Sequence, residues 1–328
     1  MKQAILYGPR DLRLENFSLD TRNLQPDQIW VKTELTALST GTDRGNYEGA
    51  EQVPGAPPYP RWVGYSNVGE VQAVGDRVTR LQPGDRVFAL KAHASDYVAE
   101  ESEPIVRIQD GIPAEDAVFT KLYHLGYHSL RRGELSFGER VAVIGLGVLG
   151  LASVELARVF GGRVIAIGNS EIRIAQAREL GAHLAVGFDD PECQEKIDDF
   201  TEGEGVELVI LATNPWPAYK VGMEIVGEGG RIAVLSLLGR GEDTADFNPL
   251  AMEWLYQKSL TITGVSLTAR ERQKLARDFT YLLSLMVDGS IRPSRLITHR
   301  LPFEQINEAY EMAYFRDKSM IGTIFQWH

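Results

Sequence analysis

Three glycines spaced as G-x-G-x-x-G are the strongest chemical signal in the sequence. They follow an apolar run and precede a stretch in which apolar residues recur at helical spacing. In that context the first glycine permits a tight turn, the second lets the backbone approach a pyrophosphate, and the third lets a helix pack closely against a sheet. The amides at the helix N-terminus would then face the anion. The dinucleotide contacts predicted from this turn are Gly145, Gly147, Val148, Leu149 and Gly150.

A glycine at the end of the next apolar run indicates which dinucleotide binds. An NAD site usually has an acidic residue there, and this chain has Gly168. A carboxylate would repel a 2′-phosphate, whereas Asn169 and Ser170 can donate hydrogen bonds and Arg173 can supply positive charge. These residues favour NADP(H), although the nearby Glu171 is itself a candidate for the ribose and would leave Arg173 as a solvated helix residue. The missing carboxylate also argues against a methyltransferase that uses S-adenosylmethionine.

The elements that must position this turn alternate between apolar runs and helical stretches. Six apolar runs are predicted as strands: 141–145, 163–168, 183–187, 208–213, 231–236 and 260–265. Strands joined by helical crossovers are typical of a doubly wound parallel sheet, which binds ligands at the carboxyl ends of its strands. The further cofactor contacts predicted at such ends are Thr213, Asn214, Ser236 and Leu237.

The first half of the chain is different and reads as β structure. Short β-rich runs are separated by Gly, Pro and Asp, with a clear turn at Pro83-Gly84-Asp85. This spacing predicts a barrel or sandwich. Residues 51–62 are rich in Pro and Gly, so we expect an irregular loop near a ligand entrance.

The C-terminal part does not continue the β/α pattern. We expect a helix over about 269–287, an amphipathic helix after Pro302 and a last strand within 320–326. This tail is predicted to complete the first domain. The expected domains are therefore 1–124 together with 265–328, and 125–264 between them.

Charge and cysteine content exclude several functional classes. The chain has 34 Lys and Arg against 45 Asp and Glu, for a net charge of −11, which disfavours nucleic acid and anionic membranes as partners. Cys193 is the only cysteine, so an internal disulfide and a cysteine-based structural zinc site are excluded. Its acidic neighbours would raise a thiol pKa, which argues against catalysis. The longest apolar stretch, 141–157, contains three glycines and a Glu. With no signal-like N-terminal run, we expect a cytoplasmic protein.

Several motifs, in order, resemble the medium-chain dehydrogenase/reductase superfamily along nearly the whole chain. The matching stretches are Gly41-Thr42-Asp43 and residues 64–71, 83–87, 143–150, 177–182 and 229–232. Residues 39–44 and 64–75 are most similar to the branch of bacteriochlorophyllide hydroxyethyl dehydrogenase-like proteins. The resemblance implies a GroES-like β-barrel catalytic domain and a Rossmann domain with a six-stranded parallel sheet.

The positions that hold catalytic zinc in many members of this superfamily carry other residues here. Thr40 replaces the cysteine before Gly-Thr-Asp, Tyr65 replaces the histidine of Gly-His-Glu, and Lys121 aligns roughly with the third ligand. Thr, Tyr and Lys are not plausible zinc ligands. We therefore expect no metal, and we interpret the scattered histidines His93, His124 and His128 as structural residues.

Without zinc, side chains must polarise and protonate the substrate. The resemblance places Tyr65 and Thr40 at the site, and Thr42 matches a hydroxyl that shuttles a proton in many zinc-dependent members. Lys121 is a candidate to stabilise an oxyanion. The alternatives are that Tyr65 only shapes the pocket and that Lys121 is a surface lysine. Tyr59, Trp62 and His124 are predicted to line the substrate pocket.

These observations predict a zinc-independent oxidoreductase that uses NADP(H) to act on a ketone or alcohol of a hydrophobic metabolite. The alternatives are an enoyl or quinone reductase that acts on C=C bonds, and a cofactor-binding protein without catalysis. We also expect a homodimer, because residues 260–265 should form the edge strand of the sheet and carry no Pro or Lys to block pairing.

Overall fold

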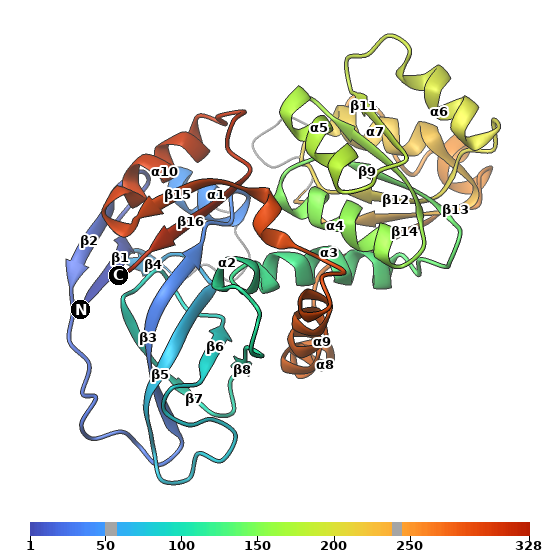
Figure 1. The fold of residues 1–328 in the computed structure, drawn as a ribbon. Helices are drawn as coiled ribbons and strands as arrows, with labels where there is room; N and C mark the ends of the chain where they lie inside the picture. Colours follow the sequence, from blue (N-terminus) through green and yellow to red (C-terminus); the bar gives the residue numbers. More distant parts are fainter. Residues whose placement is uncertain (50–57, 238–244) are drawn as a thin grey trace. The chain divides into compact units, whose positions relative to one another are not determined.

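The computed structural model describes residues 1–49, 58–237 and 245–328, which form two compact units. Unit 1 combines Met1–Leu122 with Ala269–His328, and unit 2 is Tyr123–Thr268. The expected boundaries, at residues 124 and 265, lie within four residues of these. Figure 1 shows both units in the colours of the sequence. No helix in the described ranges is long and apolar enough to cross a membrane.

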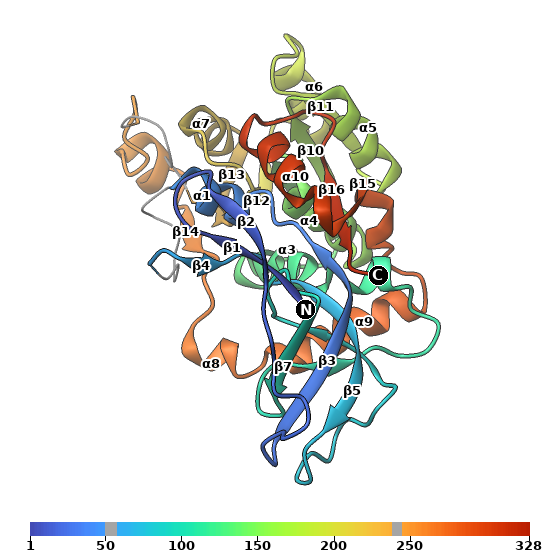
Figure 2. The same cartoon turned by 90° about the vertical axis from the view of Figure 1, so that its left-hand side faces the viewer.

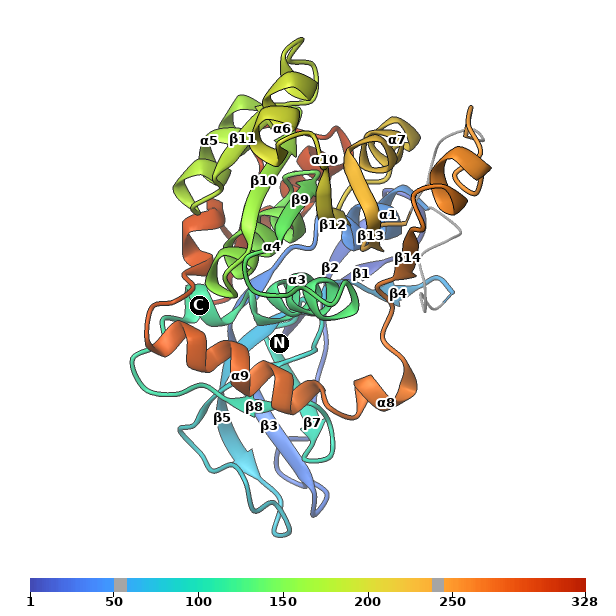
Figure 3. The same ribbon diagram turned by 90° about the vertical axis from the view of Figure 1, so that its right-hand side faces the viewer.

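Unit 2 is built on a parallel sheet of six strands in the order β11-β10-β9-β12-β13-β14 (Figure 3). In chain order the strands are β9 (Arg140–Ile144), β10 (Arg163–Gly168), β11 (Leu184–Gly187), β12 (Val206–Leu211), β13 (Val226–Val234) and β14 (Thr261–Gly264). This is the expected 3-2-1-4-5-6 order, with its reversal between β9 and β12, so the doubly wound Rossmann sheet is confirmed. The strands are nearly continuous apolar runs because helices cover both faces.

The helices of unit 2 lie between successive strands. They are α4 (Val148–Val159), α5 (Glu171–Glu179), α6 (Cys193–Thr201) and α7 (Trp216–Ile225), and a π-helical segment spans Met252–Tyr256. Val209, Leu211 and Ile232 of the strands pack with Tyr219 and Met223 of α7 in one fully buried core. This core holds the carboxyl ends of the strands, and therefore the predicted cofactor loops, in fixed positions.

Unit 1 contains a sheet in the order β15-β16-β3-β5-β6-β8, with β7 also paired to β3, and a smaller sheet in the order β2-β1-β4 (Figures 1 and 2). The N-terminal strands are β1 (Lys2–Leu6), β2 (Leu12–Asn16), β3 (Gln28–Ala37), β4 (Arg61–Trp62), β5 (Asn67–Val74), β6 (Arg86–Ala89), β7 (Asp96–Glu100) and β8 (Val106–Arg107). The C-terminal strands are β15 (Ile297–Pro302) and β16 (Gly322–Gln326). β16 pairs antiparallel with β3, so the tail completes the β domain.

The helices of unit 1 are short. They are α1 (Thr42–Glu48), α2 (Ala114–Ala117), α8 (Ala269–Arg272), α9 (Leu275–Val287) and α10 (Ile306–Tyr314), and α3 (Thr120–Arg132) runs from unit 1 into unit 2. The expected helix over 269–287 is interrupted before Leu275, where Lys274 has φ −100° and ψ 0°. The helical stretch after residue 114 is also divided. There the Val118 carbonyl accepts the Ser66 hydroxyl at 2.6 Å, outside the helical hydrogen-bond ladder.

Candidate functional site

The glycine-rich turn has the geometry that a pyrophosphate needs. Gly145 has φ +95°, which favours glycine, and a Cβ added to Gly150 would lie 1.8 Å from the Gly145 carbonyl oxygen. At Gly147 no atom lies within 4 Å of an added Cβ, so this backbone stands open. α4 begins directly after it, at Val148, with Gly147 as its N-cap. The turn therefore presents helix N-terminal amides to open space, which fits a dinucleotide.

The loop after β10 is where the 2′-phosphate was predicted. Asn169 is exposed and Ser170 is buried at the start of α5, and both line a pocket of about 620 Å³ at the carboxyl ends of β10 and β11. Arg173 is half-buried on the first turn of α5. Glu171 is highly exposed and pairs with Arg178 at 3.2 Å, so its carboxylate is engaged along its own helix. Hydrogen-bond donors and a guanidinium thus gather at this loop.

The loops after β12 and β13 are joined to each other. The Ser236 hydroxyl donates a hydrogen bond to the Thr213 carbonyl at 2.5 Å. The Thr213 side chain also packs against Gly145, where an added Cβ would lie 2.6 Å from it. Asn214 is half-buried and Leu237 is exposed. Thr213 and Ser236 therefore lie together beside the glycine-rich turn, as a shared cofactor site requires.

Four residues of unit 1 form a cluster that includes two predicted catalytic residues. The Tyr65 hydroxyl donates a hydrogen bond to Ser39 Oγ at 2.5 Å. Asp43 is buried, with 1% of its surface exposed. Its carboxylate accepts hydrogen bonds from the amides of Ser39 and Gly64. The hydroxyl of Thr42, at the start of α1, lowers the pKa of the Tyr65 phenol. We call Tyr65, Ser39, Thr42 and Asp43 the hydroxyl cluster.

Burial sets the protonation of this cluster. It raises the pKa of Tyr65 to about 12, the Asp43 charge adds to the increase, and the hydroxyls of Ser39 and Thr42 oppose it. Burial likewise raises the pKa of Asp43 to about 6, while the hydrogen bonds from the Ser39 and Gly64 amides and the neighbouring Tyr310 phenol oppose this increase. At neutral pH the cluster therefore combines a protonated phenol with a mostly ionised carboxylate.

The two other predicted catalytic residues, Thr40 and Lys121, also belong to unit 1 but have no described contact with Tyr65. Thr40 is half-buried, in the loop between β3 and α1. Lys121 is half-buried in the first turn of α3. Burial lowers the pKa of Lys121 to about 8, and the positive charge of Arg272 adds to the effect. A lysine with this pKa is not an ordinary surface residue.

The predicted pocket residues have different environments. Tyr59 is half-buried, donates a hydrogen bond to the Asn46 carbonyl at 3.2 Å, and lies under the Arg61 guanidinium. Trp62 is 56% exposed. His124 is fully buried in unit 2, where its ring stacks on His128 at 6.0 Å. His124 therefore does not share a unit with the hydroxyl cluster. Most of the predicted entrance loop, residues 51–57, lies outside the described residues.

No group of three or more His, Cys, Asp or Glu in the described parts of the chain could hold a metal ion. Thr40, Tyr65 and Lys121 stand at the positions that match the zinc ligands of the superfamily, and their hydroxyls and amine are poor donors for zinc. His93 Nδ1 and the Thr36 hydroxyl share a hydrogen bond at 2.8 Å, and the same Thr36 oxygen accepts one from the Trp327 indole. Burial lowers the pKa of His93 to about 3, so it is neutral.

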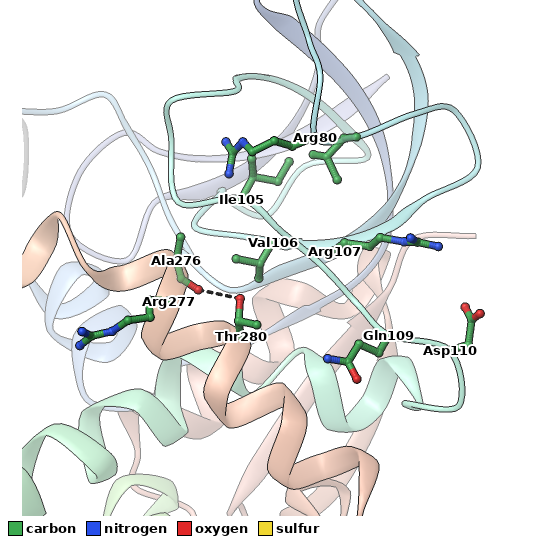
Figure 4. A pocket seen from close by; sticks show the side chains of 10 residues that line it. Arg80, Ile105, Val106, Arg107, Gln109, Asp110, Ala276, Arg277 and Thr280 are labelled. Atoms are coloured by element: carbon green, nitrogen blue, oxygen red, sulfur yellow. Dashed lines mark hydrogen bonds between the residues drawn. The ribbon is translucent and has the colours of Figure 1, made fainter.

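A second cavity, of about 560 Å³, lies in unit 1 between β8 and α9 (Figure 4). Three arginines line it, and each pairs with a carboxylate: Arg80 with Glu101, Arg107 with Asp85, and Arg277 with Asp278. None of the predicted site residues lines this cavity. This cavity is therefore separate from the hydroxyl cluster and the cofactor loops.

Sequence reasoning missed Ser39, Asp43 and Tyr310 as site residues. Asp43 stood in the motif Gly41-Thr42-Asp43, which was a usable signal. Ser39 is an ordinary serine in the sequence, and its role depends on a hydrogen bond to a residue 26 positions away. Tyr310 comes from α10, and nothing in the sequence connects it to Asp43.

Comparison with known proteins assigns both units. A model of the "Alcohol dehydrogenase GroES-like domain" matches residues 25–144, and one of "Zinc-binding dehydrogenase" matches residues 148–286. Sorbitol dehydrogenase from Halalkalibacterium halodurans is 24% identical over 315 residues, covering 86% of this chain and 87% of that protein. An NADP-dependent isopropanol dehydrogenase from Thermoanaerobacter brockii is 27% identical over 301 residues, covering 80% and 83%.

Solved structures agree with this assignment at the level of the fold. An alcohol dehydrogenase from Thermus sp. ATN1 superimposes with a TM-score of 0.82 at 23% identity, covering 99% of each chain. The two matched domains follow one another in the order that the structure shows, a GroES-like domain and then a Rossmann domain. The chain belongs to the medium-chain dehydrogenase/reductase superfamily.

Proposed function

We propose that this chain is a zinc-independent oxidoreductase that uses NADP(H) to transfer hydride to or from the ketone or alcohol carbon of a hydrophobic metabolite. One observation carries the proposal. At the position that the resemblance gives to a histidine zinc ligand, this chain has Tyr65, whose half-buried phenol donates a hydrogen bond to Ser39, and the Ser39 amide donates one to Asp43. A protonated phenol can replace a metal as the group that polarises a carbonyl.

The cofactor residues have separate tasks in this proposal. The bound nicotinamide supplies the hydride in reduction and accepts it in oxidation. The open backbone at Gly147 and the first amides of α4 hold the pyrophosphate. Asn169, Ser170 and Arg173 hold the 2′-phosphate. A relative described as NADP-dependent supports this choice of cofactor.

The side chains of unit 1 control the proton and the charge. In reduction, the Tyr65 hydroxyl turns from Ser39 Oγ to donate its hydrogen bond to the carbonyl oxygen, and it gives up its proton as the C–H bond forms. The phenolate then regains a proton from solvent through the hydroxyl of Thr42. The ammonium of Lys121 stabilises negative charge on the substrate oxygen. Thr40, Tyr59 and Trp62 line the substrate pocket.

Turnover of NADPH with a panel of ketones and enones tests the proposal. We expect ketone reduction by the wild type, and Tyr65→Phe should lower kcat by roughly 10²- to 10⁴-fold because the proton donor is lost. Tyr97→Phe is a matched control, since it removes another buried phenol of unit 1 that has no described hydrogen bond. Reduction of enones alone would favour the C=C reductase, and binding without turnover would favour a non-catalytic protein.

Metal analysis tests the zinc-independent part separately. Elemental analysis of the purified protein should find no stoichiometric zinc, and EDTA should leave ketone reduction unchanged. One zinc per chain would contradict this part of the proposal.

A further inference from the structure

Two loops of unit 1 are joined by one buried carboxylate. Asp43 Oδ2 accepts a hydrogen bond from the Ser39 amide at 2.8 Å, and Asp43 Oδ1 accepts one from the Gly64 amide at 3.0 Å. Ser39 lies in the loop after β3, and Gly64 lies in the loop before β5. Each carboxylate oxygen therefore holds one loop, and both bonds involve a charged acceptor, which makes them stronger than neutral hydrogen bonds.

These loops carry the two hydroxyls of the proton-donating centre. Tyr65 directly follows Gly64, and its phenol reaches Ser39 Oγ at 2.5 Å. The Gly64 backbone packs closely on His93 and favours glycine, because its φ is +81° and a Cβ added to it would lie 2.5 Å from the His93 ring. The relative position of Tyr65 and Ser39 thus depends on the carboxylate between their backbones.

The charge of Asp43 has no cationic partner. Asp43 forms no ion pair with any described residue, and the groups that face it are the amides of Ser39 and Gly64 and the phenols of Tyr65 and Tyr310. A negative charge in this position opposes ionisation of a neighbouring phenol. Consistent with this geometry, the Asp43 charge adds to the burial that raises the pKa of Tyr65.

We propose that Asp43 is the positioning residue of this centre: its two carboxylate oxygens hold the Ser39 and Tyr65 loops together and so fix the Tyr65 phenol relative to Ser39. The inference rests on the proposed function of Tyr65 as the proton donor. Asp43 itself does not touch the substrate. It acts through the backbone on the position of the donor and through its charge on the donor's proton.

The test is Asp43→Asn, which keeps the shape but removes the charge and one of the two acceptors. We expect kcat for ketone reduction to fall by about tenfold or more, with KM changed by less than about threefold, because a hydrogen bond to a charged group is lost away from the substrate. The pKa of Tyr65 should fall from about 12 towards its ordinary 10.0. The tyrosinate absorption of each protein is compared with that of its Tyr65→Phe counterpart.

A matched control is Asp85→Asn in the same unit. Asp85 is 6% exposed, accepts a hydrogen bond from the Gln82 amide at 2.9 Å, and lies outside the hydroxyl cluster. In this variant kcat for ketone reduction and the pKa of Tyr65 should both stay as in the wild type. The proposal is overturned if Asp43→Asn leaves both quantities unchanged, or if Asp85→Asn lowers kcat equally.

Two further outcomes keep the inference separate from the proposed function. If Asp43→Asn does not fold, Asp43→Glu decides, because it keeps the charge but displaces the carboxylate from the Ser39 and Gly64 amides, and an unchanged kcat in that variant overturns the proposal. If the wild type reduces no carbonyl compound, the proposed function fails. The Tyr65 titration still tests whether Asp43 acts on the phenol.

Discussion

Lys121 is the cation of the proposed site whose charge changes in mild alkali. Burial and the charge of Arg272 lower its pKa to about 8. Both effects disfavour the charged form, so the ammonium loses its proton well below the ordinary pKa of 10.5. A cation that stabilises an oxyanion would therefore be present at neutral pH and absent in mild alkali.

We expect kcat for ketone reduction to decrease as pH rises through about 8, because the ammonium of Lys121 is being lost. Lys121→Arg should keep charge at all working pH values and abolish this decrease, whereas Lys121→Met should lower kcat and also abolish it. The measurement is a pH profile of kcat for the three proteins. A wild-type decrease that persists in Lys121→Arg would rule out Lys121 as its source.

For single residues, the sequence indicated which hydroxyl groups belong to the site but not their burial or their contacts. Tyr65 and Thr42 followed from the motifs around them, since the residue types at those positions are readable. The burial of Asp43 and its contact with Tyr310 were not predictable, because α10 lies far along the chain. His124 shares a helix with Lys121, but the helix runs from one unit into the other.

At the level of the helices and strands, β10 contacts the glycine-rich turn. This contact limits which residue after β10 can be substituted to test the preference for NADPH over NADH. A Cβ added to Gly168 would lie 2.7 Å from Leu146 Cδ1, and Leu146 lies within the glycine-rich turn. Replacing Gly168 with Asp would therefore disturb the pyrophosphate site as well as add a charge. The next residue, Asn169, is exposed and lines the pocket after β10.

We expect Asn169→Asp to raise the KM for NADPH by about tenfold relative to that for NADH, because its carboxylate repels a 2′-phosphate. Gln176→Glu adds the same charge to α5 outside the predicted site and should leave this ratio unchanged. Steady-state kinetics with both cofactors provides the comparison. A wild type that prefers NADH would contradict the choice of NADP(H).

The regular elements were largely predictable, whereas their interruptions were not. The six parallel strands appear as apolar runs because both faces of the sheet are covered. The breaks before Thr120 and Leu275 arise from local hydrogen bonds and backbone angles that periodicity does not show. Short strands such as β4 and β8, each of two residues, carry too few side chains to give a pattern.

For the whole molecule, strand β14 leaves one edge of the Rossmann sheet unpaired among the residues that the structure describes. The Val265 amide donates to the Val234 carbonyl of β13 at 3.0 Å. Successive amides of a strand alternate in direction, so the Ile262 amide points away from β13, towards the edge. Leu250 and Met252, each 64% exposed, and Tyr256, 81% exposed, precede this strand. Such an edge is suited to pairing with a second copy of the chain.

We expect the wild type to be a homodimer joined through β14 and Ile262→Pro to be mostly monomeric at micromolar concentration. Proline removes an edge donor without removing a hydrogen bond to β13. Ile262→Thr keeps the amide and should remain a dimer. Light scattering gives the masses, and circular dichroism checks the fold. A monomeric wild type, or a dimeric Ile262→Pro, would contradict this arrangement.

The pairing of β3 with β16 also has a consequence for the time course of synthesis. Thr36 and Trp327, which share a buried hydrogen bond at 3.0 Å, are 291 positions apart. At about 5–20 residues per second, a ribosome makes the later strand roughly 15 to 60 s after the earlier one. All of unit 2 is translated within that interval. The nascent Rossmann unit can fold while the edge of β3 that later pairs with β16 is still open, so a chaperone that protects unpaired strand edges would be needed mainly for the first part of the chain.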